Sequence, residues 1–256
     1  MDKTQQGSVT ISTSDGVATI EFFHPAQNSL PGRLLAELAS AFDQAGADPN
    51  AKIVILRSAG DRSFCAGASF DELMAIRDFE TGKRFFLGFA NVINAMRRCP
   101  KLIIGRLHGK AVGGGVGLAA ATDYCMATQW ATIKLSELAV GIGPFVVGPA
   151  CERKLGLSAY SQLAINATEW QTAYWAKEKG LFNEVFETPE QMDDYLARFT
   201  KILVKSSPEA MRELKRIFWQ GTENWDTLLD ERAAISGRLV LSDFTRNAIE
   251  AFKAKA

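Results

Sequence analysis

Two short runs of small residues are the part of the sequence that could do chemistry. They lie about 45 residues apart, at 64–68 (FCAGA) and 113–117 (GGGVG), and a helix is expected after each of them. A loop that runs into a helix leaves backbone N–H groups unpaired, with the positive end of the helix dipole behind them. Two such loops that meet at one point would form an oxyanion hole, which stabilises an enolate or a tetrahedral oxyanion. The sequence therefore predicts a site that polarises a carbonyl group.

A carboxylate follows the second run, at Glu137 in the tripeptide Leu135-Ser136-Glu137. Its apolar neighbours Leu135 and Leu138 favour partial burial, which would raise the pKa of Glu137 toward that of a useful proton carrier. A buried acid beside an oxyanion hole could move a proton next to the polarised carbonyl. Glu137 is therefore the candidate acid–base residue, and a plain surface charge is the alternative.

The glycine run also fits a weaker pattern. Residues 115–120 match Gly-x-Gly-x-x-Ala, and Glu137 lies about 20 residues further on, where a dinucleotide site would have its ribose-binding acid. Such a fingerprint belongs to the first βαβ unit and follows an uninterrupted strand, whereas Gly105 and Gly109 interrupt this approach. A purely structural role, in which the glycines only permit close helix packing, is a second alternative. The matching loop at 66–68 favours the oxyanion hole over both.

Composition narrows the class of protein. The chain has 256 residues, is 47% hydrophobic and 23% charged, and carries no formal net charge, so neither nucleic acid nor an anionic membrane surface is an expected partner. Residues 1–8 are polar and no apolar run approaches the roughly 18 residues of a membrane span, which favours a cytoplasmic location. Four widely spaced cysteines and two histidines predict free thiols and no metal site.

The expected elements alternate between strands and helices up to about residue 135. Residues 9–12 and 17–23 flank Ser14-Asp15-Gly16 and predict a β-hairpin. Continuous apolar runs at 53–56 and 102–104 are typical of strands covered on both faces. Helices are expected at 34–45, 70–76, 85–96 and 116–121, and a weak strand at 126–134. This alternation predicts βαβ units around a largely parallel sheet.

The second half of the chain has the composition of a helical region. Residues 150–256 are expected to be almost wholly helical, and proline or Ser/Thr capping signals mark several of the starts. The expected helices are 159–166, 172–179, 189–205, 208–219, 225–237 and 242–253. The residues by themselves therefore predict an α/β core over about 1–150 that carries a helical region.

These residues together resemble the crotonase, or enoyl-CoA hydratase/isomerase, superfamily. The resemblance covers nearly the whole chain and includes Asn28-Ser29-Leu30, the 64–68 loop, His108-Gly109 before the glycine run, Asp123, Ser136-Glu137, Gly141, and Ala173 through Gly180-Leu181-Phe182. It implies an α/β crotonase-like fold, with a ββα spiral core over 1–195 and a C-terminal helical trimerisation region over 196–256. It also implies a homotrimer or homohexamer.

The resemblance assigns roles to particular residues. The backbone amides of Ala68 and Gly114 would hold the thioester oxygen of an acyl-CoA, and Glu137 would carry the proton. Coenzyme A, as part of the substrate and with no permanently bound cofactor, would lie along Ala66, Gly67, Ala68, Ser69 and Phe70. The acyl pocket would include Gly113, Gly117 and Phe145. Phe244, Arg246 and Lys253 could provide aromatic and basic contacts to a nucleotide phosphate, but helix packing and solvent exposure are favoured for all three.

One position departs from the family pattern. Many family hydratases hold a water molecule between two glutamates, and the position of the first is Gly117 here, so only Glu137 remains. One base suffices for an isomerase, whereas hydration also requires an activated water. Asp71, Glu72, His108 and Tyr124 could assist, although a cap, loop or core role is favoured for each.

The finer pattern favours hydration. GGVGL at 114–118, Leu135-Ser136-Glu137 and GIGPFVV at 141–147 resemble the single-glutamate, methylglutaconyl-CoA hydratase-like members. Lys83 or Arg84 could bind a distal carboxylate, but surface roles are favoured for both. The sequence thus predicts an enoyl-CoA hydratase; the alternatives are an enoyl-CoA isomerase that uses the same glutamate and a catalytically silent CoA-binding protein. A related serine peptidase would need a serine within 115–121, where none occurs.

Overall fold

Two β-sheets organise the chain in the computed structural model, which describes residues 6–253. The larger sheet has the strand order β1-β2-β3-β5-β7-β9 and is parallel except for the first pair. Its strands are β1 (Ser8–Ser14), β2 (Val17–Phe23), β3 (Ile53–Ser58), β5 (Leu102–Leu107), β7 (Tyr124–Thr128) and β9 (Glu184–Phe186). The predicted hairpin is confirmed, and its two-residue turn has positive φ at Asp15 (51°) and Gly16 (81°).

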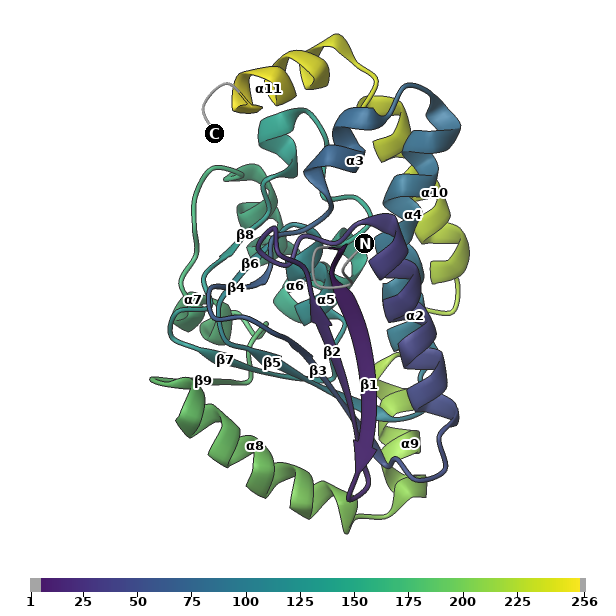
Figure 1. Cartoon of the computed structure of the whole chain (residues 1–256), viewed down its shortest axis with the longest axis vertical. Helices are drawn as coiled ribbons and strands as arrows, with labels where there is room; N and C mark the ends of the chain where they lie inside the picture. Colours follow the sequence, from purple (N-terminus) through teal and green to yellow (C-terminus); the bar gives the residue numbers. More distant parts are fainter. Residues whose placement is uncertain (1–5, 254–256) are drawn as a thin grey trace.

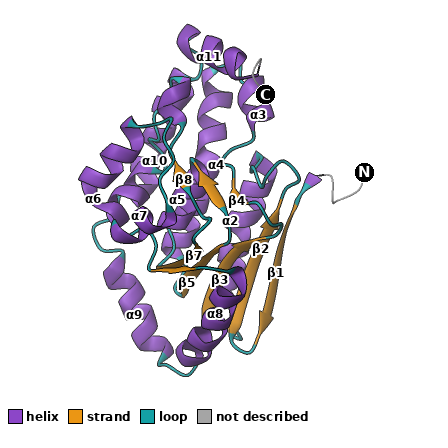
Figure 2. Ribbon diagram, turned by 90° about the vertical axis from the view of Figure 1, so that its left-hand side faces the viewer, coloured by secondary structure: helices purple, strands orange, loops and turns teal. Residues whose placement is uncertain are grey.

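Helices cover both faces of the larger sheet (Figure 2). On β3, Val54 and Leu56 join the main core with α2 (Gly32–Ala47) and α4 (Phe79–Arg98), whereas Ile53 and Ile55 face α8 (Pro189–Val204) and α9 (Pro208–Phe218). Successive side chains of a strand point to opposite faces, so a strand covered on both sides must be apolar throughout. This confirms the prediction that residues 53–56 form a strand covered on both faces.

A second, three-stranded sheet has the order β4-β6-β8 and is parallel throughout. Its strands are short: β4 (Ser63–Cys65), β6 (Lys110–Val112) and β8 (Ile133–Lys134). The expected weak strand at 126–134 is in fact two strands, β7 and β8, which lie in different sheets. Because parallel neighbours end at the same edge, the segments that follow these three strands are brought together.

The remaining helices extend from this core (Figure 1). They are α3 (Phe70–Ala75), α5 (Gly114–Ala120), α6 (Gly148–Ile165), α7 (Ala173–Glu178), α10 (Trp225–Leu239) and α11 (Asp243–Lys253), with a 3-10 helix η1 (Glu137–Val140). Helix α10 packs closely on α4, where a Cβ at Gly82 would lie 2.9 Å from the Gly237 carbonyl oxygen. Helix α11 lies at the end of the molecule beside η1 and α3.

Two expected helix starts need correction. Helix α4 begins at Phe79 rather than at residue 85, because the Asp78 side chain caps it by accepting a hydrogen bond from Thr81 N (2.8 Å). Helix α6 begins at Gly148, eleven residues before the expected start, and is kinked at Gly156 (φ 73°). The region after residue 150 also contributes β9 to the sheet, so it is not wholly helical. The predicted division at 195/196 falls inside α8.

Candidate active site

The three predicted catalytic residues follow the three strands of the small sheet. Ala68 comes three residues after β4, Gly114 two residues after β6, and Glu137 three residues after β8. The register pairs Cys65 with Ala111 and Val112 with Lys134, so the three strands end side by side. The topology therefore brings residues far apart in the sequence to one edge.

Short distances confirm that these segments meet. A Cβ placed on Gly67 would lie 3.7 Å from the Gly114 nitrogen, and one on Gly113 would lie 2.9 Å from Glu137 Oε1. Gly67 (φ 92°) and Gly113 (φ 52°) both have backbone conformations that side chains disfavour. Glycine at these positions thus lets the two loops and the carboxyl group approach one another.

The hydrogen bonds around Ala68 leave its amide free. Leu30 N donates to Gly67 O (2.8 Å), and Ser69 N donates to Leu30 O (3.1 Å). These bonds form a parallel bridge that flanks Ala68 on both sides, so the N–H of Ala68 points away from Leu30. Among the hydrogen bonds of residues 6–253, the Ala68 amide has no acceptor.

The amide of Gly114 is free for a different reason. Gly114 is the first residue of α5, and the first N–H groups of a helix have no intrahelical acceptor. Its neighbour Gly113 instead donates to Lys134 O (2.9 Å), which fixes the loop to β8. No acceptor for Gly114 N occurs elsewhere in the described chain. The structure thus provides two unpaired N–H groups on adjacent loops, as an oxyanion hole requires.

The carboxyl group of Glu137 is buried although the residue as a whole is partly exposed. Its Oε2 is shielded from solvent and has no hydrogen-bond partner in the described part of the chain. Burial raises the pKa of Glu137 to about 7. Glu137 starts η1, which ends at Gly141 in the left-handed region (φ 79°). The geometry therefore holds a carboxyl group that can both take and give a proton near neutral pH.

Two side chains of α6 near Glu137 did not emerge from the sequence as site residues. Burial, then the charges of Cys151 and Glu137, raise the pKa of Tyr160 to about 12. The Tyr160 hydroxyl donates a long hydrogen bond to Pro144 O (3.4 Å). Burial, then the charge of Glu137, also raises the pKa of the Cys151 thiol. Only the positive-φ Gly156, which lets α6 fold back, could have signalled that Tyr160 returns to this region.

Gly117, at the position that the family resemblance assigns to the first of two glutamates, lies against Val147. A Cβ on Gly117 would be 2.4 Å from Val147 Cγ1 and 2.7 Å from Val147 Cβ. The space for a side chain at this position is thus already filled by Val147. The side chain of Val147 therefore occupies the space that the first glutamate would need.

This contact makes a testable prediction for stability. Gly117→Ala is expected to lower the free energy of unfolding by about 1–3 kcal/mol because the new methyl group overpacks a filled site. In the Val147→Ala background the same substitution should cost less, which urea titration of both single variants and the double variant would measure. An equal cost of Gly117→Ala in the wild-type and Val147→Ala backgrounds would contradict the packing explanation.

The predicted coenzyme A segment lies beside the two loops. Ala66 N donates to Gln27 O (3.2 Å), and the Ser69 hydroxyl caps α3 by accepting from Glu72 N (3.4 Å). Phe70 is the first residue of α3. Phe145 packs its ring over Gly143, where a Cβ would lie 2.4 Å from the ring. Phe145 is partly exposed rather than fully buried in the core.

The secondary candidates have other roles in the structure. Glu72 accepts from Gly32 N (2.8 Å), and Tyr124 packs against Phe199 with ring centroids 4.9 Å apart. Lys83 pairs with Asp230 (2.8 Å). Arg84 and Asp71 are exposed. His108 is buried, which lowers its pKa, and its ring nitrogens have no hydrogen-bond partner among residues 6–253.

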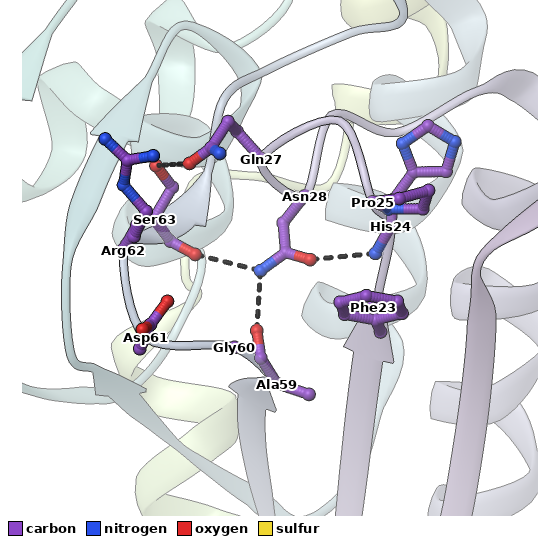
Figure 3. Close-up of a pocket in the computed structure, with 10 residues that line it drawn as sticks. All are labelled: Phe23, His24, Pro25, Gln27, Asn28, Ala59, Gly60, Asp61, Arg62 and Ser63. Atoms are coloured by element: carbon purple, nitrogen blue, oxygen red, sulfur yellow. Dashed lines mark hydrogen bonds between the residues drawn. The ribbon is translucent and has the colours of Figure 1, made fainter. Parts of the chain in front are cut away.

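A cavity of about 120 Å³ lies between the segment after β2 and residues 59–63 (Figure 3). The Asn28 amide organises its wall: its nitrogen donates to the carbonyl oxygens of Ala59 (2.8 Å) and Ser63 (2.8 Å), and its oxygen accepts from His24 N (2.8 Å). Arg62 lies at the rim. Asn28 belongs to one of the motifs in the sequence, but no pattern in the sequence indicated this cavity.

Two further features of residues 6–253 bear on the class of protein. No group of three or more His, Cys, Asp or Glu side chains in this range could hold a metal ion. No helix in this range is long and apolar enough to cross a membrane.

Comparison with known proteins gives a family match over nearly the whole sequence. The model of the family "Enoyl-CoA hydratase/isomerase" matches residues 12–254. The short-chain-enoyl-CoA hydratase of Clostridium acetobutylicum is 28% identical over 96% of this chain and 94% of its own. The peroxisomal Delta(3,5)-Delta(2,4)-dienoyl-CoA isomerase of Arabidopsis thaliana is 26% identical over 88% and 84%. Both hydratases and isomerases are therefore among the relatives.

The mitochondrial methylglutaconyl-CoA hydratase of Mus musculus is 31% identical over 77% of this chain and 63% of its own. Among solved structures, an enoyl-CoA hydratase from Bacillus halodurans superposes with a TM-score of 0.88 over 95% of this chain and 99% of that one, at 18% identity. At this identity the superposition bears on the fold alone, and it confirms the predicted crotonase-like α/β architecture with a helical C-terminal region.

Proposed function

Because the chain belongs to the enoyl-CoA hydratase/isomerase family, we propose that it adds water reversibly to the C2–C3 double bond of a 2-enoyl-CoA thioester. The observation that carries this proposal is the buried Glu137 carboxyl beside the loop of the free Gly114 amide, so close that a Cβ on Gly113 would lie 2.9 Å from Glu137 Oε1. This arrangement supplies an acid–base group next to a pair of oxyanion donors.

The proposed reaction needs three groups of this chain. The Glu137 carboxylate takes a proton from water as the water oxygen bonds to C3 of the enoyl group. The double-bond electrons shift to the thioester oxygen, where the amides of Ala68 and Gly114 stabilise the enolate. Protonated Glu137 then gives its proton to C2, which restores the thioester and the carboxylate. A carboxyl pKa of about 7 suits both transfers.

Coenzyme A would enter as part of the substrate. With the thioester oxygen at Ala68 and Gly114, the pantetheine arm would follow residues 66–70. The cavity of Figure 3 is linked to this segment through Gln27, whose main-chain oxygen accepts from Ala66 N (3.2 Å), and Arg62 on its wall is suited to the phosphate-bearing end of the molecule. For the acyl group, the similarity to the mouse methylglutaconyl-CoA hydratase supports a branched, 3-methylglutaconyl type.

An enoyl-CoA isomerase is the second candidate function, and one observation favours it. Val147 fills the space beside Gly117, so a second carboxylate cannot activate water from that position. An isomerase would use Glu137 alone to move a proton between C2 and C4 of the acyl chain.

Oxygen labelling separates the two functions. The chain is incubated in H₂¹⁸O with a panel of straight, branched and dicarboxylic 2-enoyl-CoA and 3-enoyl-CoA esters, and products are analysed by mass spectrometry. A hydratase places one ¹⁸O on C3 of a 2-enoyl ester, and the ester converted fastest identifies the acyl class. Conversion of a 3-enoyl ester to a 2-enoyl ester without label would establish the isomerase. Intact CoA binding without turnover would establish a silent CoA-binding protein.

We also propose that the chain forms a homotrimer or homohexamer in the cytoplasm. Sedimentation velocity of the purified chain measures this oligomeric state.

A further inference from the structure

A second cavity lies at the other end of α5 from the oxyanion hole. Its volume is about 250 Å³, and Asp123, Arg153, Lys154 and Phe218 line it. Gly114 begins α5, whereas Asp123 comes three residues after its last residue. Arg153 and Lys154 belong to α6, and Phe218 ends α9. The proposed hydration uses none of these side chains.

The single carboxylate of this cavity is already saturated. Asp123 Oδ2 accepts from Ile103 N (2.7 Å) and Lys215 Nζ (2.7 Å), and Oδ1 accepts from Trp219 Nε1 (2.8 Å). The ion pair with Lys215, whose side chain is buried, balances the charge of Asp123. Against the larger effect of burial, the charge of Asp123 also raises the pKa of Arg153 and of Lys154, but one carboxylate cannot balance these two cations in addition to Lys215.

Arg153 and Lys154 have no such carboxylate. Lys154 Nζ donates to the main-chain oxygen of Asp123 (3.2 Å), and neither side chain forms an ion pair within the described residues. Burial lowers the pKa of both groups, which is the direction for cations held away from water without sufficient compensation. The cavity thus has two positive charges in excess.

The guanidinium of Arg153 also has an unused binding edge. Its Cζ lies 3.9 Å from the centroid of the Trp219 ring, while Nε and Nη2 are shielded from solvent and have no hydrogen-bond partner in the described part of the chain. The same edge of Arg106 binds the Asp193 carboxylate, through Nε (2.6 Å) and Nη2 (2.7 Å). This edge matches two oxygens of a carboxylate or phosphate. Buried charged donors without acceptors are costly, so an oxyanion would relieve the cost.

We propose that this cavity binds a phosphate group, either inorganic phosphate or the phosphate of a small organic molecule. A phosphate group carries about −1.5 to −2 charge at pH 7, which matches the two uncompensated cations better than a singly charged carboxylate does. Because Nε and Nη2 are shielded, binding shifts the guanidinium toward the anion and away from the Trp219 ring. The partly exposed ring of Phe218 forms an apolar wall for an organic substituent.

Calorimetric titration of the full chain with inorganic phosphate, at constant ionic strength set with chloride, tests this site. The wild type should bind one phosphate per chain. Lys154→Met should raise the dissociation constant for phosphate at least tenfold. Lys154→Gln is the second variant if the first does not fold. Lys101→Met is the matched control, since Lys101 Nζ also donates to main-chain carbonyls but lies outside the cavity. Arg62→Ala tests whether the phosphate binds instead in the cavity of Figure 3.

The fluorescence of Trp219 gives an independent readout. Phosphate should change the emission of the wild type because the Arg153 cation stacked on the Trp219 indole moves. Trp219→Phe lacks this indole and should lose that change. Binding that is lost in Arg62→Ala, or unchanged in the foldable Lys154 variant, would overturn the assignment. So would a wild type that gives neither heat nor an emission change. A glucose phosphate tested alongside inorganic phosphate distinguishes a free anion from an organic ligand.

Discussion

Glu137→Gln is expected to lower kcat for the thioester substrate by about 10²- to 10⁴-fold, the usual contribution of a positioned acid–base group. Glutamine keeps the size of the side chain but cannot take a proton from water or return one to C2. The two amides that we propose hold the thioester oxygen stay in place, so KM should change little. Initial rates of hydration over a range of substrate concentrations give both constants.

A matched control and a stability measurement exclude simple misfolding. Glu152→Gln, at an exposed position on α6, should leave kcat unchanged. Glu137→Gln should also be more stable than the wild type above pH 7, because it removes a carboxylate that burial disfavours. A variant that loses activity through loss of structure would show the opposite change in its denaturant midpoint.

The sign of this stability effect follows from the pKa of Glu137. Burial raises this pKa from the ordinary 4.5 to about 7, so the folded chain binds the proton more tightly than the unfolded chain does. The associated stability is fully present below about pH 4.5 and is lost as pH rises through about 7. The whole difference is on the order of 3 kcal/mol. Glu137→Gln should therefore abolish this part of the decline in unfolding free energy.

Activity should have the reverse pH dependence. The free enzyme needs the carboxylate form to accept a proton, so kcat/KM should rise as pH increases through about 7 and then level off. The residual rate of Glu137→Gln should lack this inflection. An inflection near 7 that persists in the variant would assign it to another group, and Glu137 would then not be the base.

The sequence predicted the long elements of the fold because they have strong periodic patterns. The hairpin of β1 and β2, the two-face-covered strand β3, and helices α2 and α8 to α11 all lie within a few residues of their expected bounds. The missed elements are short. Strands β4, β6 and β9 have three residues each, too few to establish a period of two.

This limit matters most at the site. The loops at 64–68 and 113–117 and the acid Glu137 were recognisable from residue type, but their meeting depends on the side-by-side pairing of β4, β6 and β8. Sequence alone supplied that convergence only through resemblance to a family. The approach of Tyr160 to Glu137 was invisible for a similar reason, because it depends on the kink of α6 at Gly156.

Gly114→Ala is expected to lower kcat by about 10²- to 10³-fold, the cost of losing one oxyanion-hole donor. The new Cβ would lie 2.2 Å from the Cζ atom of the buried Phe89 ring and within 2.6 Å of two further ring atoms. The alanine keeps its N–H, so the loss comes from displacement of the loop that aims this donor. An enolate gains most from donors that are already in position, so a small shift has a large effect on the rate.

A double variant distinguishes this displacement from general damage to the protein. Phe89→Ala removes the ring that the new methyl group meets, so Phe89→Ala with Gly114→Ala should regain at least tenfold in kcat over Gly114→Ala alone. Gly105→Ala, on β5 of the larger sheet, is the matched control: its Cβ would lie 2.9 Å from Thr122 Cγ2. It should lower the free energy of unfolding and leave kcat of the folded enzyme unchanged, since it moves neither donor. If Gly114→Ala retains full kcat while being equally destabilised, the amide of residue 114 does not hold the developing oxyanion, because a donor placed this tightly cannot be shifted without a change in rate.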